Sequence, residues 1–363
     1  MLYENANLLY RGGDDAIRSA SWKYHSQLFE KNQLLEVAKL QEEIRNLTYQ
    51  ADIGNNFVIN ERGKRRVVTS ISCRDKAVNH MLCDNVLSPI LDKYLIYDNS
   101  SSREGKGTAF HRMRLEQHLH EYYRKCKTNK GYILLGDFQN YYGSIDTKRA
   151  REKMIYLLKK SGELSDEDIK ATEWLLETIF GNKIGINIGS QPSQNIGITY
   201  AYRIDNYVKT VRGQKWYARY SDDFRIISNS KEELLDILEG IKKIADEEKL
   251  VIHPRKTHIA RIDKPFTRLQ ISYFLTDTGK LVKRIKPKAI KRERDRLKAY
   301  KRLLDAGRMS EIDIENAYKC WLMCNYKVMS SIQIQRINGL YKELFGREIR
   351  WKNGKLRYLT KAR

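Results

Sequence analysis

An acidic pair between two apolar runs constrains this chain more than any other feature. Residues 217–228 read YARYSDDFRIIS, so Asp222 and Asp223 occupy a turn between two segments that each fit a short β-strand. A third acid, Asp137, ends the apolar run YILLGD that begins at residue 132. Like charges at the ends of neighbouring strands are costly unless a cation neutralises them. For a bare acidic pair in a turn, the simpler interpretation is a solvated hairpin.

The charge balance indicates what the chain binds. The 363 residues have a formal net charge of +23, which favours a polyanionic partner, and the 23 tyrosines suit stacking on bases. A basic but inert surface is the alternative. The five cysteines are odd in number and scattered, which favours a reducing compartment. No secretory signal or apolar run long enough for a bilayer is evident, so we expect a cytoplasmic protein without a membrane partner.

The order of the predicted elements gives the fold class. The chain begins with helical periodicity over 14–50, a hairpin over 55–72, a helix over 75–95 broken at Pro89, and a helix over 108–127. After residue 132 the order is β–α–ββ–α–β, which predicts an α+β protein with a split-βαβ antiparallel sheet. In that sheet the first strand and the central hairpin are neighbours, so the three acids can converge. The remaining elements that we expect are helices over 147–160, 166–180 and 231–248, a helix ending near 209, a strand over 250–260 and a mostly helical, basic end.

Clustered carboxylates without His or Cys fit a hard cation. Mg²⁺ prefers oxygen ligands, and Mn²⁺ is the alternative ion. Two such ions about 4 Å apart are the usual arrangement for in-line phosphoryl transfer in polymerases and nucleases. We therefore interpret Asp137, Asp222 and Asp223 as candidate metal ligands. Catalysis would then be two-metal nucleotidyl transfer.

Seven short motifs, in order along the chain, resemble those of reverse transcriptases. DFQNYYGSID from residue 137 and YSDD from residue 220 resemble the two acidic motifs of the active site. GKRRVV with RDKAVNH, and NSSSREGKGTAFHRM, resemble two motifs of the fingers. NIGSQPSQ resembles the glycine–glutamine motif, LVIHPRKT the motif that follows the acidic pair, and ISYFL the start of the palm–thumb hairpin.

The resemblance implies a role for each matching residue. Asp137, Asp222 and Asp223 would bind the metals together with the Phe138 carbonyl, and Lys256 would protonate the departing pyrophosphate. Tyr142 would stand as a steric gate against the ribose 2′-OH, although Tyr141 and Tyr142 could both simply pack a turn. The remaining implied contacts are Lys64, Arg66, Ile188, Gly189 and Gln194 for the nucleotide, and Arg103, Lys106, Gly107, Lys291, Arg294 and Lys298 for the template and primer.

One motif separates subfamilies. Most reverse transcriptases have glutamine where this chain has Ile188, before Gly189. The pattern is similar to that of bacterial reverse transcriptases from diversity-generating retroelements, which copy a template RNA with frequent errors at adenine. These enzymes are relatives of group II intron and retron reverse transcriptases. NAYKCWLMCNY also resembles the thumb of that lineage. Ile186-Asn187 in place of Leu-Pro, and Ser-Ser in the fingers loop, depart from its pattern.

The resemblance implies a right-hand polymerase with fingers at 1–131, a split-βαβ (RRM-like) palm at 132–279 and a helical thumb at 280–363. Its function would be RNA-directed DNA polymerisation that copies a dedicated RNA into cDNA. The implied partners are the template RNA, the cDNA product, dNTPs and a small basic accessory protein. The alternatives are a related bacterial reverse transcriptase of an anti-phage defence system or retron, and a non-catalytic RNA-binding protein on a polymerase scaffold.

Overall fold

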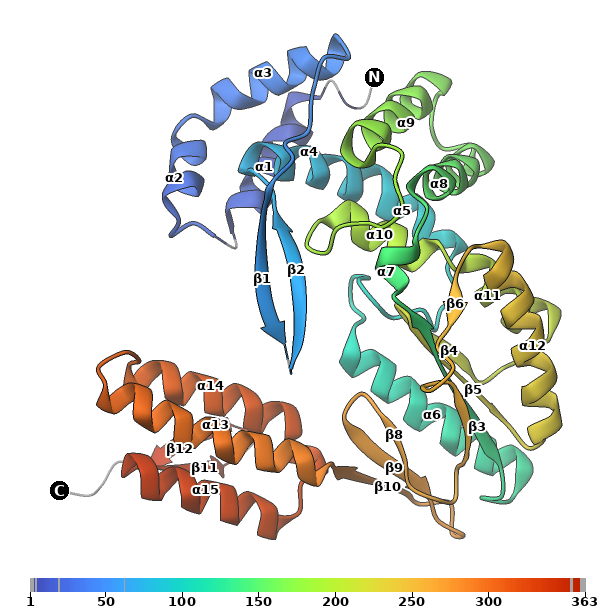
Figure 1. Cartoon of the computed structure of the whole chain (residues 1–363), viewed down its shortest axis with the longest axis vertical. Helices are drawn as coiled ribbons and strands as arrows, with labels where there is room; N and C mark the ends of the chain where they lie inside the picture. Colours follow the sequence, from blue (N-terminus) through green and yellow to red (C-terminus); the bar gives the residue numbers. More distant parts are fainter. Residues whose placement is uncertain (1–2, 4, 19, 62, 353–354, 360–363) are drawn as a thin grey trace. The chain divides into compact units, whose positions relative to one another are not determined.

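The computed structural model describes two compact units. The first comprises Met1–His118 and Tyr132–Ile259, and the second comprises Leu119–Gly131 and Ala260–Arg363. The backbone is described except at 1–2, 4, 19, 62, 353–354 and 360–363 (Figure 1). Side chains are described except at those positions and at 61, 64, 348, 350–352 and 355–359. The helices, together with strand pairs that are antiparallel in each register that the structure gives, establish an α+β protein.

Three helices stand where one helix over 14–50 was predicted. They are α1 (Ala6–Arg18), α2 (Tyr24–Lys31) and α3 (Gln33–Arg45). Asn32 ends α2 and precedes α3 with φ −107° and ψ 13°, so the helical hydrogen bonding stops there. The periodicity was continuous across this break, which is why the prediction of a single helix was wrong.

The hairpin predicted over 55–72 is confirmed. Strands β1 (Asn55–Glu61) and β2 (Lys64–Ser70) pair in antiparallel register, with Phe57 opposite Val68. Figure 1 shows them as a ribbon that projects from the N-terminal helices. A two-stranded ribbon is marginally stable alone, and a backbone hydrogen bond of 3.3 Å from Thr69 to the Ile188 carbonyl holds its base to a distant loop.

The next helix continues past Pro89 instead of breaking there. It consists of α4 (Cys73–Leu82), a π-helical turn (Cys83–Leu87), α5 (Ser88–Leu91) and a short 3₁₀ turn (Asp92–Tyr94). Pro89 lies in the first turn of α5, where its missing N–H costs little. Helix α6 (Thr108–Cys126) follows close to the predicted bounds.

The central sheet brings distant segments together. Its strands are β3 (Tyr132–Gln139), β4 (Tyr217–Tyr220), β5 (Asp223–Ser228) and β6 (Val251–Ile252), in the order β4-β5-β3-β6. The first strand and the central hairpin are therefore neighbours, as the element order predicted. The strand expected over 250–260 is instead two short strands, β6 and β7 (His258–Arg261), and both pair with β3.

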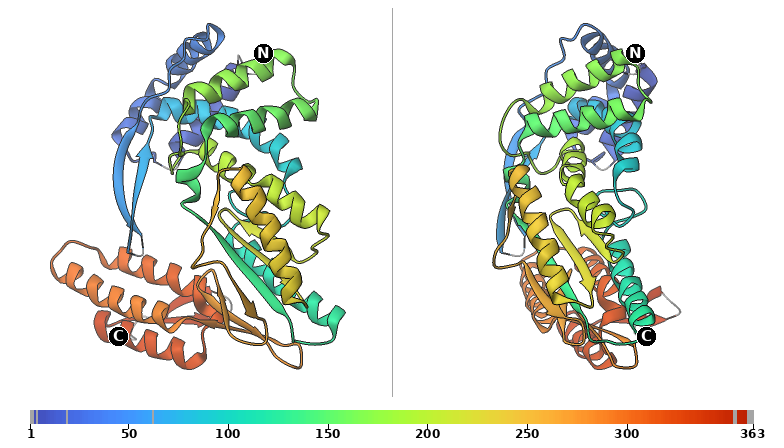
Figure 2. Two further views of the ribbon diagram at one scale, coloured as in Figure 1. Left: turned by 45° about the vertical axis from the view of Figure 1, so that its right-hand side comes forward. Right: turned by 90° about the vertical axis from the view of Figure 1, so that its right-hand side faces the viewer.

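Helices connect and cover these strands. The segment between β3 and β4 contains the predicted pair α8 and α9, whereas the helix expected to run to residue 209 is interrupted after Thr199. Helix α12 buries residues at helical spacing, among them Ile237 and Ile241, in one core with Phe224 and Ile226 of β5. Figure 2 shows α12 running beside the sheet. The helices of this part are α7 (Tyr141–Ser144), α8 (Thr147–Ser161), α9 (Asp166–Phe180), α10 (Gln191–Thr199), α11 (Tyr202–Asn206), a π-helical turn (Tyr207–Val211) and α12 (Lys231–Glu247).

The second unit has its own core. Stacked rings of Tyr318 and Tyr341 pack with Leu297 between its helices. The prediction of a mostly helical end is correct except for a final two-stranded sheet. Among the described residues, no helix is both long and apolar enough to span a bilayer. The elements are β8 (Phe266–Arg268), β9 (Ile271–Leu275), β10 (Leu281–Ile285), α13 (Pro287–Asp305), α14 (Glu311–Asn325), a 3₁₀ turn (Tyr326–Val328), α15 (Ser331–Phe345), β11 (Glu348–Lys352) and β12 (Lys355–Leu359).

Candidate active site

The three predicted acids meet at one edge of the central sheet. Asp137 near the end of β3 is the register partner of Asp223 at the start of β5. Asp222 lies in the turn just before Asp223, and its carbonyl accepts a 3.1 Å hydrogen bond from the Phe138 amide. Residues 85 apart in the sequence are thus fixed across a single strand pair. The convergence expected from the strand order is what the backbone shows.

The carboxylates of the cluster repel one another. Burial, together with the charges of Asp223 and Asp137, raises the pKa of Asp222 to about 6. One cation compensates in part, because the Lys256 ammonium lies 2.7 Å from an Asp137 carboxylate oxygen. Carboxylate oxygens in mutual repulsion fit a divalent cation of the hard class. The metal-ligand role of Asp137, Asp222 and Asp223 stays a prediction.

The segment after β6 forms hydrogen bonds with the backbone of Asp137. The Asp137 carbonyl accepts from the His253 amide at 2.8 Å, and the Asp137 amide donates to the Thr257 hydroxyl at 3.3 Å. Lys256 comes from the same segment, so its position depends on this docking. Sequence reasoning found Lys256 through its motif. It missed His253 and Thr257, whose contacts form only across the fold.

The two tyrosines after β3 differ in their surroundings. Tyr141 is buried, stacks on Phe138 and donates to the Gly197 carbonyl at 2.8 Å. Tyr142 is half-buried and hydrogen-bonds Ser221 of the acidic turn, while burial raises its pKa. A side chain at Gly197 would lie 2.6 Å from the Tyr142 hydroxyl, so glycine there makes room for the ring. Tyr142 is the tyrosine beside the acids, and Tyr141 belongs to the core.

The glycine–glutamine motif forms a loop against the hairpin. Ile188 is 36% exposed, and its carbonyl accepts a hydrogen bond from the Thr69 amide. Gly189 has φ +122°, and a Cβ there would lie 3.0 Å from Val68, so both conformation and contact favour glycine. Gln194 is exposed on α10, which begins beyond this loop.

The predicted phosphate contacts of the hairpin share one strand. Lys64 and Arg66 are both on β2, two residues apart, which puts them on the same face as Val68. Arg66 is exposed at that face. The Lys64 backbone is in place, but its side chain lies outside the described residues.

The serine-rich loop before α6 folds on itself. Arg103 donates to Asp92 and to the carbonyls of Ile96 and Asn99, and its side chain is 10% exposed. Its guanidinium is therefore used inside the loop, which leaves little of it for a template. The Lys106 ammonium donates to the Tyr97 carbonyl at 2.6 Å, and the Gly107 amide donates to the Ser100 carbonyl at 2.8 Å.

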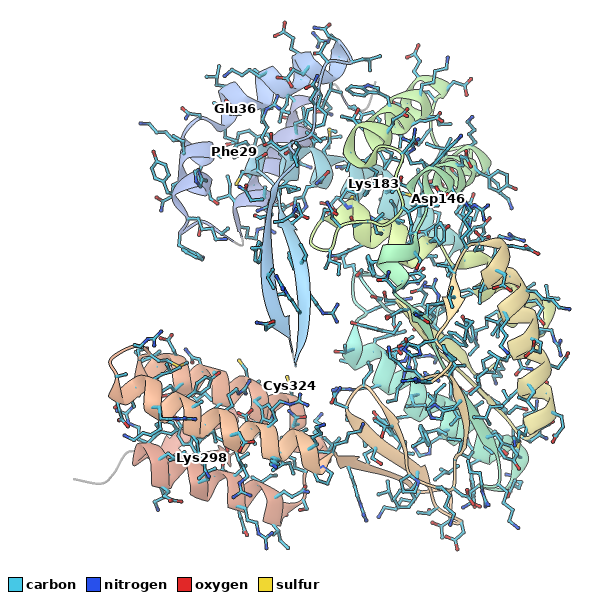
Figure 3. All side chains as sticks on the ribbon, in the orientation of Figure 1. Phe29, Glu36, Asp146, Lys183, Lys298 and Cys324 are labelled. Carbon is cyan, nitrogen blue, oxygen red and sulfur yellow. The ribbon has the colours of Figure 1, made fainter. Side chains whose placement is uncertain are left out.

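The basic helix of the second unit lines a groove. Lys291, Arg294 and Lys298 of α13 are exposed and face a groove of about 820 Å³ (Lys298 is labelled in Figure 3). Arg336 of α15 lines the same groove. Helical spacing could predict the first three as one stripe, but Arg336 joins them only through the packing of α13 on α15.

Solved structures of telomerase resemble the fold of this chain. Telomerase from Candida albicans in complex with the TWJ fragment of telomeric RNA matches with a TM-score of 0.50 and 12% identity, over 66% of this chain and 46% of that one. Apo telomerase from Candida tropicalis matches with a TM-score of 0.50 and 15% identity, over 81% of this chain and 60% of that one. The chain thus spans about half of the length of these solved relatives, and at such identity the likeness concerns the fold.

Sequence comparison gives the family. No curated protein matches the chain. The family model described as reverse transcriptase (RNA-dependent DNA polymerase) matches residues 55–274, which include the hairpin, the acidic cluster and the strands β8 and β9. This match confirms the prediction of an RNA-directed DNA polymerase domain, a nucleotidyltransferase. The chain belongs to the reverse transcriptase family.

Proposed function

We propose that the chain copies a dedicated RNA into cDNA with frequent errors, as the polymerase of a bacterial diversity-generating retroelement. The observation that supports polymerisation is the cluster of Asp137 on β3, Asp223 on the adjacent β5 and Asp222 in the turn before it, within the segment that the family model matches. The organisation in this proposal is fingers at 1–131, a split-βαβ palm at 132–279 and a thumb at 280–363.

Mg²⁺ is the ion proposed for the cluster. Asp137, Asp222 and Asp223 would hold it, with the Phe138 carbonyl as a further oxygen ligand. When bound, divalent ions neutralise the carboxylates, favour deprotonation of the attacking hydroxyl and stabilise the leaving pyrophosphate. The raised pKa of Asp222 supports this assignment, because a cation at that point would relieve the repulsion that raises it.

The surrounding side chains orient the substrates. Lys256 holds a proton next to Asp137 and donates it to the departing pyrophosphate. The Tyr142 ring excludes a ribose 2′-OH and so selects dNTPs. Lys64 and Arg66, on one face of β2, bind the triphosphate.

Template and primer are held by charge. Lys291, Arg294 and Lys298 bind phosphates in the groove along α13. Lys106 and Gly107 border the template path, whereas the internal hydrogen bonds of Arg103 remove it from the proposed contacts. A small basic accessory protein completes the assembly in this proposal.

Error-prone copying rests on Ile188. An apolar side chain there cannot hydrogen-bond near the nascent base pair, which loosens the check on its geometry. Ile188→Gln should therefore lower misincorporation several-fold, most visibly opposite template adenine, because a regained contact of about 1 kcal/mol changes an equilibrium ratio about fivefold. Deep sequencing of cDNA from one RNA measures this.

The matched control is Ile184→Gln, at a second exposed isoleucine of the same loop. It should leave the error spectrum unchanged. A wild-type enzyme that is accurate at adenine would remove the retroelement assignment. Sequencing the cDNA made from co-purified RNA identifies the natural template in the same experiment.

A reverse transcriptase of a defence system or retron is the second candidate. The observation that favours it is Ile186-Asn187, which departs from the Leu-Pro of the retroelement pattern. Accurate copying opposite adenine would support this candidate. Failure to extend any primed RNA would instead support a non-catalytic RNA-binding protein.

A further inference from the structure

The N-terminal helices border a groove that has no role in the proposal above. Residues of α2 and α3 line one wall, and residues 52–55 and 70–76 line the other, around a volume of about 850 Å³. Phe29 and Glu36, both labelled in Figure 3, lie on the helical wall. The family match begins at residue 55, so this wall lies outside it. The helical wall is thus an addition to the matched polymerase segment, whereas residues 70–76 of the other wall belong to it.

Two lysines give the groove available positive charge. Lys23 lines it from the helical wall and Lys76 from the start of α4. Neither ammonium forms an ion pair with any described residue, whereas Arg74 between them is paired with Glu36 and Glu43. An anion that bound Arg74 would have to compete with these two carboxylates. Lys23 and Lys76 are therefore the cations that can bind an incoming anion.

Two large exposed aromatic side chains flank Lys23 in the sequence. Trp22 is 77% exposed and Tyr24 is 71% exposed. The Lys23 ammonium lies 5.3 Å from the Trp22 ring centre, and the Tyr24 ring contacts His25, which also lines the groove. Exposed rings that alternate with cations are the arrangement that stacks on unpaired bases and contacts the adjoining phosphates.

The groove continues toward the glycine–glutamine loop. Ile71 and Lys76 also line a second cavity of about 400 Å³, whose other wall includes Gly189 and Gln194. Asp15 lines that second cavity as well. A carboxylate repels phosphate but accepts hydrogen bonds from base amino groups, so bases fit this part better than backbone. The shared lining residues therefore connect the loop beside the proposed nucleotide site, over Lys76, with the groove that Lys23 lines and that Trp22 and Tyr24 flank in the sequence.

We propose that this path binds the single-stranded RNA template that has not yet been copied. Lys76 and Lys23 contact its phosphates, and Trp22 and Tyr24 stack on its bases. A duplex would not satisfy the site, because its bases present no free faces to the rings. An acidic protein segment would use the lysines but not the stacking surfaces. The proposal rests on the proposed function, since it needs a template that extends beyond the copied position.

The test compares two primed RNAs that differ only in the template beyond the primer. One leaves about 2 unpaired template nucleotides and the other about 12, and the dissociation constant of each is measured by fluorescence anisotropy at one salt concentration. For the wild-type chain the longer overhang should bind about tenfold more tightly, which corresponds to about 1.4 kcal/mol. Trp22→Ala with Tyr24→Ala should remove most of this gain, and so should Lys23→Glu with Lys76→Glu.

The matched control carries Tyr156→Ala and Lys170→Glu, an exposed tyrosine and lysine on α8 and α9 away from the groove. It should keep the tenfold gain. The exposure of Trp22 and Tyr24 means that their removal should not change the thermal midpoint, which checks folding.

The outcomes distinguish a failure of the groove assignment from a failure of the proposed function. If the groove variants keep the overhang gain, or if an acidic peptide displaces the overhang as well as oligouridine does, the groove assignment is wrong. If the wild-type chain extends neither primed RNA, the proposed function itself fails. Crosslinking of 4-thiouridine, placed about 6 nucleotides into the overhang, to the peptide that contains Trp22 would support the path directly.

Discussion

At the scale of single residues, buried charges hold the acidic turn in place. Arg219 is fully buried and donates to both carboxylate oxygens of Asp205 and to the Ser221 carbonyl, just before the acidic pair. Removing one partner of such a pair is costly because the other is left buried and charged. The acids themselves could be predicted from the apolar runs around them. Arg219 reads in the sequence as an ordinary strand residue, and its partner 14 positions away becomes visible only in the fold.

The first prediction concerns the metal ligands. Asp223→Asn should lower primer extension at least about 100-fold, because it removes a charge that stabilises the transition state through bound metal. RNA binding should change little. Timed extension of a primed RNA in Mg²⁺ measures the rate. Asp246→Asn, at an exposed acid of α12, is the control and should extend normally, while a normal rate in Asp223→Asn would exclude the cluster as the catalytic centre.

The second prediction concerns sugar selection. Tyr142→Val should allow rNTPs to compete with dNTPs, because the ring beside the acidic turn no longer overlaps a 2′-OH. Tyr141→Ala should instead lower the free energy of unfolding by about 3 kcal/mol or more, since it empties a core position. Competition assays and thermal melts separate the two effects. Relaxed sugar selection in Tyr141→Ala alone would mean that the assignment of the gate is wrong by one residue.

At the scale of elements, apolar periodicity predicted that a helix or strand is present more reliably than it predicted where that element is interrupted. The hairpin, α8, α9 and α12 were predicted within about two residues, because each combines a clear period with polar caps such as Ser230 before α12. The breaks after Thr199 and at Asn32 were missed. At these points the apolar pattern continues while the backbone turns to follow the core. Local sequence does not encode that requirement.

The third prediction concerns how α6 docks on β5. His118 of α6 contacts Arg225 of β5 at 3.0 Å and also contacts Arg114 and Asp98. Lys209 pairs with Asp98. Burial, with the Arg225 charge, lowers the pKa of His118 to about 4, and Asp98 offsets this only in part.

The direction of the pH dependence follows from whether the folded or the unfolded chain binds a proton at His118 more readily. The unfolded chain takes up a proton at His118 near pH 6.5 and the folded chain only near pH 4, so stability is lost as pH falls between these values. From pH 7 to pH 5 the free energy of unfolding should fall by about 2 kcal/mol from this group. Urea denaturation at both pH values measures it. His118→Gln cannot take up the proton and should show a correspondingly smaller change; an equal change in both proteins would contradict the assignment.

At the scale of the whole molecule, the net charge and the family motifs predict more about function than any single contact does. The net charge of +23 predicted a polyanion partner, and the motif order predicted the family that the match over residues 55–274 establishes. The final two-stranded sheet and the groove beside α2 were not predicted. The final sheet and the helical wall of the groove lie outside the family motifs, where one sequence offers periodicity but no pairing partner.

The last prediction concerns the basic groove of the second unit. Lys291→Glu, Arg294→Glu and Lys298→Glu together should weaken binding to every primed RNA alike, because phosphate contacts carry no sequence information. The slope of log K against log salt should become shallower by about 0.7 to 0.9 for each lost contact.

The matched control reverses the same number of charges on the same helix, at Lys288, Arg292 and Arg302, which are exposed and outside the groove. Both triple variants change the net charge equally, so a general loss of attraction would affect both. A smaller slope in the groove variant alone locates the phosphate contacts between α13 and α15. Equal slopes would mean that these lysines and arginines act only through net charge, and loss of binding for one template sequence alone would mean that they contact bases. Arg336→Glu tests the groove from its other wall. As an arginine of α15 that lines the groove, Arg336 should account for one further phosphate contact in the salt slope, although no sequence pattern links it to α13.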